Sequence, residues 1–150
     1  MVEKTPINVK TIGIIHSPYK ERHQAPRQGT NEIVEIEIKK EYEEGLSDLE
    51  DFSHIHVFYW LHKSEGYNLM VKTPWEEKKH GVFATRSPNH PNPLGYSVVK
   101  LIGKKNNILK VKGLDAIDGT PVIDIKPYIK KIDQKKDVVS GWSGKTDLKF

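Results

Sequence analysis

Residues 33–39 read IVEIEIK, and their strict alternation of apolar and charged side chains decides the fold class. Successive side chains of an extended chain point to opposite faces, so Val34, Ile36 and Ile38 share one face and charged side chains share the other. This pattern is typical of a β-strand that buries one face in a core and exposes the other to water. The segment therefore predicts a sheet with one apolar face.

Strand patterns of similar length flank this segment on both sides. They cover residues 9–16 (VKTIGIIH), 54–62 (HIHVFYWLH), 81–86 (GVFATR), 95–102 (GYSVVKLI), 108–112 (ILKVK) and 122–126 (VIDIK). Residues 54–62 are apolar or aromatic on both faces, which is expected of a central strand. Residues 103–107 (GKKNN) predict a hairpin connection. The helical spacing of apolar side chains in residues 42–52 predicts a short helix or turn.

Six or seven short strands with little helix predict a mainly β fold. Because closure leaves a sheet without exposed edges, we expect a single-sheeted β-barrel of six to seven strands with short helices. We expect no Rossmann sheet, since no glycine-rich dinucleotide fingerprint or P-loop follows a strand. The chain of 150 residues has no repeat or linker and predicts one domain, residues 1–150. Its polar tail, residues 131–150, is expected either to be mobile or to dock through Trp142.

Composition excludes several classes of protein. The chain has no cysteine, which excludes disulfides, thiolate metal sites and a cysteine nucleophile. No apolar run reaches the roughly 20 residues of a membrane span, and the N-terminus lacks a signal-peptide core. We therefore expect a cytoplasmic protein with no membrane partner. The net charge of +4 and the paired lysines allow contacts with nucleic-acid phosphates, although charge alone is explained more simply by a solvated surface.

Three loops combine turn-forming residues with side chains suited to ligands. Residues 17–29 (SPYKERHQAPRQG) are long and polar, and Arg27 offers a planar fork for a carboxylate or phosphate. Three prolines stiffen residues 85–93 (TRSPNHPNP), where Arg86 marks the end of the expected strand. Residues 114–121 (LDAIDGTP) contain an Asp-Gly turn whose amides and carboxylate could face a ligand. For each loop, an ordinary surface connection remains the alternative.

The histidines of the central strand raise the question of a metal. His54, His56 and His62 share one face of the expected strand, and a His-x-His pair is a usable metal spacing. His62 would lie about 20 Å from His56 along a strand, and no neighbouring carboxylate completes the site. We therefore expect no metal and a packing or hydrogen-bonding role for His54 and His56. A metal hydrolase remains an alternative that elemental analysis would test.

Taken together, these segments resemble the tRNA (N6-threonylcarbamoyladenosine) N6-methyltransferases, a family of S-adenosylmethionine-dependent enzymes with a β-barrel fold. The matching segments run in order over residues 11–130. They are Ile12-Gly13, Ser17-Pro18-Tyr19-Lys20, Pro26-Arg27-Gln28-Gly29, Phe52-Ser53-His54-Ile55, His62-Lys63, residues 81–88 (GVFATRSP), residues 91–95 (PNPLG), Asp118-Gly119-Thr120-Pro121 and residues 124–128 (DIKPY).

The resemblance implies S-adenosylmethionine as the methyl donor and N6 of threonylcarbamoyladenosine, next to the tRNA anticodon, as the acceptor. It also implies a homodimer with the cofactor near the subunit interface. By position, the cofactor-binding residues are Pro26, Arg27, Gln28, His62, Lys63, Arg86, Tyr96, Asp118, Gly119, Thr120 and Pro121. The chain departs from the family pattern at Asn89-His90, where His-Arg is usual. It also departs at His56, where tryptophan is frequent, and at Tyr96, which is usually aliphatic.

The chemistry of such a ligand assigns roles to these side chains. Arg27 or Arg86 would hold the methionyl carboxylate, and Asp118, Tyr19 or Tyr96 would face the sulfonium. Asp118 and His90 are the catalytic acid or base to be tested. Tyr19, Lys20 and Asn92 are expected to contact the substrate. Two alternatives remain: a methyltransferase acting on another RNA or a small molecule, and a module that binds cofactor or RNA without catalysis.

Overall fold

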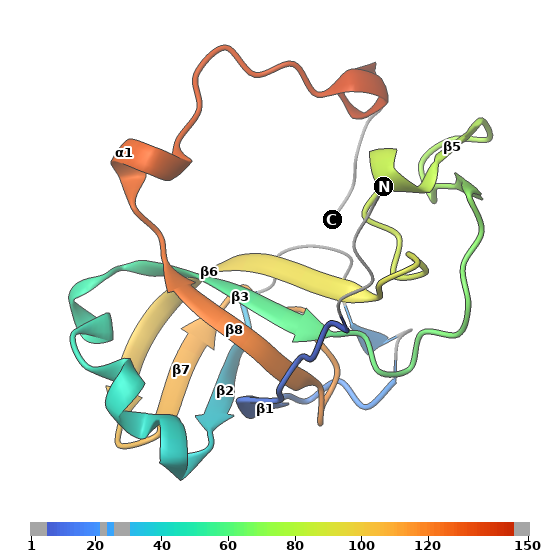
Figure 1. Ribbon diagram of the computed structural model, residues 1–150. Helices are drawn as coiled ribbons and strands as arrows, with labels where there is room; N and C mark the ends of the chain where they lie inside the picture. The colour runs from blue at the N-terminus through green and yellow to red at the C-terminus, as the bar shows by residue number, and fades with distance from the viewer. Residues whose placement is uncertain (1–5, 22–23, 26–30, 146–150) are drawn as a thin grey trace.

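The structure is a computed structural model that describes residues 6–21, 24–25 and 31–145. Six antiparallel strands close into a barrel in the order β1-β2-β7-β6-β3-β8 (Figure 1). The strands are β1 (Gly13–His16), β2 (Ile33–Ile38), β3 (His54–Trp60), β6 (Leu94–Lys105), β7 (Ile108–Lys112) and β8 (Pro121–Pro127). The pairing of β1 with β8 closes the sheet. The predicted mainly β, six- to seven-stranded barrel with short helices is therefore confirmed.

The barrel interior is filled by alternate residues of its strands. In β2 the buried and exposed positions alternate through the whole strand, as the IVEIEI pattern predicts. The core includes Ile15, Val34, Ile36, Ile38, Ile55, Val57, Val99, Leu109, Val111 and Val122. Burial of each such side chain contributes roughly 1.5–3 kcal/mol, so the inward-facing residues are the main source of stability.

The expected strands differ from the observed ones mainly at their ends. The run 9–16 forms a strand only from Gly13, and the run 54–62 ends at Trp60. Strand β6 continues to Lys105, so the hairpin connection has two residues, Asn106 and Asn107, in place of the five predicted. Asn106 adopts a φ of 54°, which asparagine tolerates at a tight turn.

The strand predicted at residues 81–86 is wrong. Only Gly81 lies in a strand, at the end of β5 (Lys79–Gly81), which pairs with β4 (Met70–Lys72) outside the barrel. Residues Val82–Ala84 form the short 3₁₀ helix η4, because the Thr85 amide and hydroxyl both donate to the carbonyl of Val82. This turn buries Val82 and leaves Phe83 exposed, so the apolar run does not face a sheet.

Short helices complete the chain. Most of residues 42–52, predicted as a short helix or turn, lie in the 3₁₀ helices η2 (Lys40–Leu46) and η3 (Leu49–Asp51), which add Leu46 and Leu49 to the core. After β8 the chain forms α1 (Lys130–Asp133) and η5 (Gly141–Lys145). In the part of the chain that the structure describes, no helix has the length and apolar character to cross a membrane.

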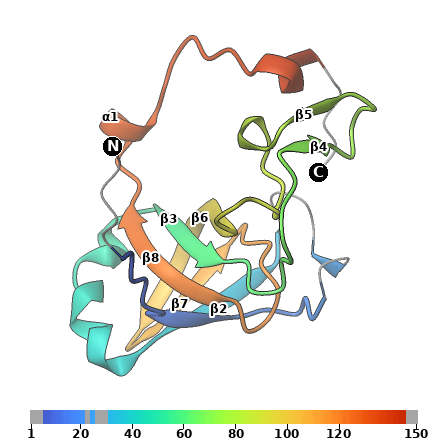
Figure 2. The same cartoon turned by 45° about the vertical axis from the view of Figure 1, so that its right-hand side comes forward.

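The C-terminal tail arches over one side of the barrel toward the ribbon of β4 and β5 (Figures 1 and 2). At its far end, Trp142 donates its indole N–H to the carbonyl of Ala84 at 2.7 Å. The same ring stacks on His80, with ring centroids 4.7 Å apart, and also lies close to Trp75. Trp142 therefore fastens the tail to the segment between β3 and β6.

Candidate functional site

The strand register brings the three candidate loops to one end of the barrel. Strand β1 leads into residues 17–32 where it meets the start of β2 and the start of β8. Residues 113–120 join the end of β7 to the start of β8, and residues 61–93 join the end of β3 to the start of β6. The pairs Trp60 with Leu94 and Tyr59 with Val122 place these connections at the same end. The connections that carry the three candidate loops therefore leave the barrel at the same end.

Asp118 ties the first loop to the third. Its carboxylate accepts the Ser17 amide at 3.0 Å and the Lys20 ammonium at 2.9 Å, and its own amide donates to the carbonyl of Tyr19 at 2.6 Å. The hydrogen bond from Lys20, followed by that from Ser17, holds the pKa of Asp118 below its ordinary value. Tyr19, Lys20 and Asp118, predicted to be functional, therefore lie together. We call Ser17, Tyr19, Lys20 and Asp118 the Lys20–Asp118 cluster.

The other residues of the Asp-Gly-Thr-Pro turn, Gly119, Thr120 and Pro121, are held by contacts with the backbone of neighbouring segments. Gly119 has a φ of 83°, which favours glycine, and its amide donates to the carbonyl of Ile15 at 2.8 Å. The Thr120 hydroxyl is buried and donates to the carbonyl of Ile117 at 2.6 Å. Pro121 begins β8 opposite Ile14. These contacts hold the turn that carries Asp118.

Arg86 and Tyr96 form the second group at this end. The guanidinium carbon of Arg86 lies 5.9 Å from the centroid of the Tyr96 ring, within the range of a cation–π contact. Tyr96 projects from the outer face of β6, where the rings of Phe58 and His56 lie 5.3 and 5.7 Å away. We call Arg86, Tyr96, His56 and Phe58 the Arg86–Tyr96 cluster.

The other predicted residues surround Arg86 in sequence. His90 shares a hydrogen bond of 3.1 Å between its Nε2 and the carbonyl of Thr85. The Ser64 hydroxyl lies within hydrogen-bonding distance of Pro88 and Asn89, which joins the exposed His62-Lys63 turn to the proline-stiffened loop. Asn92 is exposed, and its carbonyl accepts the amide of Leu94.

The predicted cofactor-binding residues are only partly covered by the structure. Pro26, Arg27 and Gln28 lie outside the described residues. Arg86 and Asp118 project from loops at the same barrel end and, among the described residues, form no hydrogen bond or ion pair with each other. The Lys20–Asp118 and Arg86–Tyr96 clusters are therefore described as two separate groups at the same end of the barrel.

A polar network just inside this end escaped the sequence predictions. The buried Tyr59 hydroxyl lies 3.2 Å from the carboxylate of Asp115, to which it donates, and 3.0 Å from the Ser97 hydroxyl. Burial raises the pKa of the Asp115 carboxyl. Burial and the charge of Asp115 raise the pKa of Tyr59, whereas the charge of Arg86 opposes that rise. The only sequence signal was a single aspartate among the apolar residues of 114–117.

His54 and His56 hydrogen-bond, as predicted. His54 Nδ1 lies 2.7 Å from the Ser53 hydroxyl, and His56 bonds Tyr96 and Asp133. His62 lies beyond the end of β3 and does not share their strand face. Across the ranges that the structure describes, no group of three potential ligands is arranged to hold a metal.

A family model described as the tRNA-methyltransferase O N-terminal domain matches residues 14–134. The chain belongs to this family. The matched span begins in β1 and ends just after α1, so it contains the barrel, all three loops and Asp133. The family resemblance inferred from the sequence motifs is therefore confirmed.

Individual members of the family show the same relationship. A probable S-adenosyl-L-methionine-binding protein of Archaeoglobus fulgidus is 49% identical over 138 residues, which is 91% of this chain and 38% of that protein. The tRNA (adenine(37)-N6)-methyltransferase of Escherichia coli is 36% identical over 145 residues, covering 88% of this chain and 62% of the enzyme. The crystal structure of TrmO from Pseudomonas aeruginosa matches with a TM-score of 0.79 and 34% identity, over 94% of this chain and 64% of that one. The chain thus spans less than two thirds of each of these proteins.

Proposed function

We propose that residues 1–150 act as a single S-adenosylmethionine-binding barrel domain that methylates N6 of threonylcarbamoyladenosine beside the tRNA anticodon. The observation that carries this proposal is the convergence of the three candidate loops at one barrel end in a member of the tRNA-methyltransferase O family. Relatives named for S-adenosyl-L-methionine binding and for methylation of adenine 37 support it.

The Arg86–Tyr96 cluster fits a sulfonium amino acid. Arg86 is exposed and forms no ion pair with any described carboxylate, so its planar fork is available for the methionyl carboxylate. The aromatic face of Tyr96 attracts positive charge, as its contact with Arg86 illustrates. That face would suit the sulfonium once the guanidinium turns from the ring to the methionyl carboxylate. When bound, S-adenosylmethionine supplies an electrophilic methyl group.

The Lys20–Asp118 cluster fits a supporting role better than proton transfer. Both carboxylate oxygens of Asp118 already accept hydrogen bonds, and the lowered pKa of this carboxyl makes it a weak base. We assign Asp118 and Gly119 to holding the cofactor side of the site. Tyr19, Lys20 and the exposed Asn92 are assigned to the substrate side.

His90 is the better candidate for the base. Its Nε2 faces the carbonyl of Thr85, which can only accept, so Nε2 carries the proton. In neutral imidazole the other nitrogen, Nδ1, then has a free lone pair. The urea-like N6 of the acceptor is a poor nucleophile because its lone pair is delocalised, and removal of its proton would promote transfer. We assign that step to Nδ1 of His90.

A homodimer is part of this proposal. Leu94 and Val98 project from the outer face of β6 with exposed fractions of 48% and 40%, on either side of Tyr96. Exposed apolar side chains beside the Arg86–Tyr96 cluster suit a second copy of the chain, which would place the cofactor near the subunit interface. Light scattering coupled to gel filtration gives the mass in solution: the dimer mass supports this arrangement, and the monomer mass contradicts it.

The direct test is a methyl-transfer assay with bulk tRNA, followed by mass spectrometry of the nucleosides. We expect methylated threonylcarbamoyladenosine from tRNA that carries the modification and no product from tRNA that lacks it. Methyl transfer to another nucleoside, independent of the threonylcarbamoyl group, would contradict the proposed substrate.

The second candidate function is cofactor binding without catalysis. It is favoured by the names of relatives with higher identity, such as the Archaeoglobus fulgidus protein at 49%, which is described only as a probable S-adenosyl-L-methionine-binding protein. Protein that binds S-adenosylmethionine in a calorimeter but labels no nucleic acid with a methyl group would establish this function and exclude the first.

A further inference from the structure

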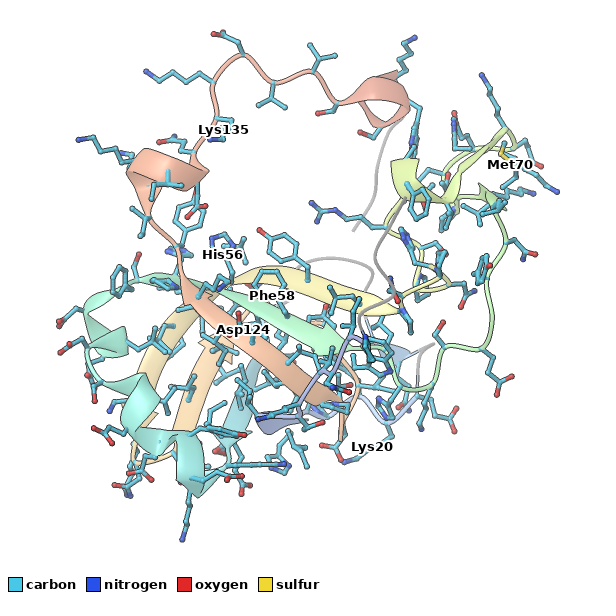
Figure 3. The ribbon with its side chains drawn as sticks, in the orientation of Figure 1. Lys20, His56, Phe58, Met70, Asp124 and Lys135 are labelled. Atoms are coloured by element: carbon cyan, nitrogen blue, oxygen red, sulfur yellow. The ribbon has the colours of Figure 1, made fainter. Side chains whose placement is uncertain are left out.

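His56 bridges two parts of the molecule that are remote in sequence. Its Nδ1 lies 2.9 Å from the hydroxyl of Tyr96 on β6, and its Nε2 lies 3.1 Å from the carboxylate of Asp133 at the end of α1. The His56 side chain is only 12% exposed, and that of Asp133 is 25% exposed. Figure 3 shows His56 and Phe58 on the side of the barrel that faces the tail. The bridge therefore connects the barrel wall with the C-terminal segment.

The partners of His56 fix its protonation pattern. A carboxylate can only accept hydrogen bonds, so Nε2 of His56 donates to Asp133. In neutral imidazole, Nδ1 then accepts the hydroxyl proton of Tyr96. Each group has its partner in one arrangement, whereas the opposite tautomer would place two acceptors against each other. The bridge consequently has a defined direction, from Tyr96 through His56 to Asp133.

Both ends of the bridge are anchored. Asp133 also accepts the amide of Ile129 at 2.7 Å, and its contact with His56, followed by that with Ile129, lowers the pKa of its carboxyl. At the other end, the Tyr96 ring lies nearly parallel to the His56 ring, with an interplanar angle of 18°, and Arg86 lies over it. Tyr128 packs against His56 with ring centroids 5.4 Å apart. The Tyr96 ring thus lies in contact with both His56 and Arg86.

We propose that His56 is a positioning residue for the Arg86–Tyr96 cluster and that α1 holds His56 in place through Asp133. The proposal rests on the proposed function, because it assigns the cofactor to Arg86 and Tyr96. Its consequence is that the C-terminal segment controls cofactor affinity without touching the cofactor. Removal of Asp133 frees the imidazole to rotate and to change tautomer, and the Tyr96 ring then loses its fixed orientation beneath Arg86.

The test compares substitutions at the two ends of the bridge. We expect Tyr96→Phe, which removes only the hydroxyl, and Asp133→Ala each to weaken S-adenosylmethionine binding about fivefold to tenfold in calorimetry. Both substitutions break the same bridge. The affinity of the double variant for S-adenosylmethionine is therefore expected to equal that of the single variant with the lower affinity. Asp133→Glu is expected to restore part of the affinity.

The matched control is Asp124→Ala. Asp124 lies on β8 opposite Phe58 and pairs with Lys126 at 3.1 Å, and among the described residues it forms no hydrogen bond or ion pair with His56. We expect this variant to bind with wild-type affinity. Nitrogen NMR of the His56 imidazole reports its tautomer, which a simple loss of packing would not change. We expect the Nε2–H tautomer in the wild type and a mixture of tautomers in Asp133→Ala.

The outcomes separate the two proposals. A wild-type protein that binds no S-adenosylmethionine overturns the proposed function and the positioning role together. A wild-type protein that binds, with Tyr96→Phe and Asp133→Ala at the same affinity, overturns only the positioning role. Additive losses in the double variant would also overturn it, since independent effects exclude a shared bridge.

Discussion

Gly95 and Tyr59 lie opposite each other on β6 and β3, and the absence of a side chain at Gly95 makes room for the Tyr59 ring. A Cβ atom at Gly95 would overlap the ring of Tyr59, which is 5% exposed and cannot move aside without disturbing Ser97 and Asp115. We therefore expect Gly95→Ala to lower the free energy of unfolding by about 1–3 kcal/mol in denaturant titrations.

Gly103, in the same strand, is the control for this substitution. A Cβ atom there would meet no atom within 4 Å, and its φ is not positive. Gly103→Ala should leave the free energy of unfolding nearly unchanged. Equal stability of the two alanine variants would show that the packing of Tyr59 against β6 is looser than the structure indicates.

Arg86 is the residue on which the cofactor site most depends. Its guanidinium is exposed and positioned by Tyr96, so it can bind a carboxylate through two parallel hydrogen bonds. We expect Arg86→Ala to abolish S-adenosylmethionine binding in calorimetry while the circular dichroism spectrum stays that of the wild type. Arg86→Lys, which keeps the charge but loses the planar fork, should bind with intermediate affinity. Wild-type affinity in Arg86→Ala would refute the assignment.

Asp118 gives a prediction about pH. The hydrogen bond from Lys20 is the largest cause of its lowered pKa, so Lys20→Ala should raise the pKa of Asp118 toward the ordinary value. Because the pKa of Asp118 is lowered, its ionised carboxylate holds the two loops together fully at pH values above the ordinary carboxyl pKa. This stabilisation is lost as the pH falls through the lowered pKa. Carbon NMR titration of the Asp118 carboxyl in the wild type and in Lys20→Ala measures the shift. An unchanged Asp118 titration would mean that Lys20 does not bind it in solution.

At the scale of elements, the tail is fastened at two points. Asp133 holds α1 to His56, and Trp142 holds η5 to Ala84 and His80. We expect Trp142→Ala to increase amide hydrogen exchange in residues 134–145 and in β4 and β5, with little change in the barrel strands. Val139, which is 92% exposed, provides the control substitution Val139→Ala. Unchanged protection in Trp142→Ala would show that the indole does not fasten the tail.

Sequence patterns predicted those elements whose residues alternate between core and solvent. Residues 33–39 alternate because β2 lies in the barrel wall, and the observed strand differs by one residue. Residues 81–86 contain a short apolar run that predicts a strand, but they turn at Val82, because the hydroxyl of Thr85 competes for the carbonyl that a strand would have used. A local side-chain hydrogen bond of this kind cannot be read from alternation.

At the scale of the whole molecule, the sequence predicted those site residues that lie within a recognisable loop. Lys20 and Asp118 belong to two of the predicted loops, and the barrel closure that brings them together also follows from the strand pattern. The pairs Tyr59 with Asp115 and His56 with Asp133 were not predicted. They join residues far apart in sequence through side-chain directions that only the folded chain defines.

The most direct test of the central claim is a crystal structure of the protein with S-adenosylmethionine. We predict that the cofactor binds at the barrel end where β1 and β3 end and β6 and β8 begin. Its carboxylate should lie on Arg86 and its sulfonium should face Tyr96. Cofactor bound at the opposite end, near the Asn106-Asn107 turn, or away from both the Arg86–Tyr96 and Lys20–Asp118 clusters, would contradict the claim.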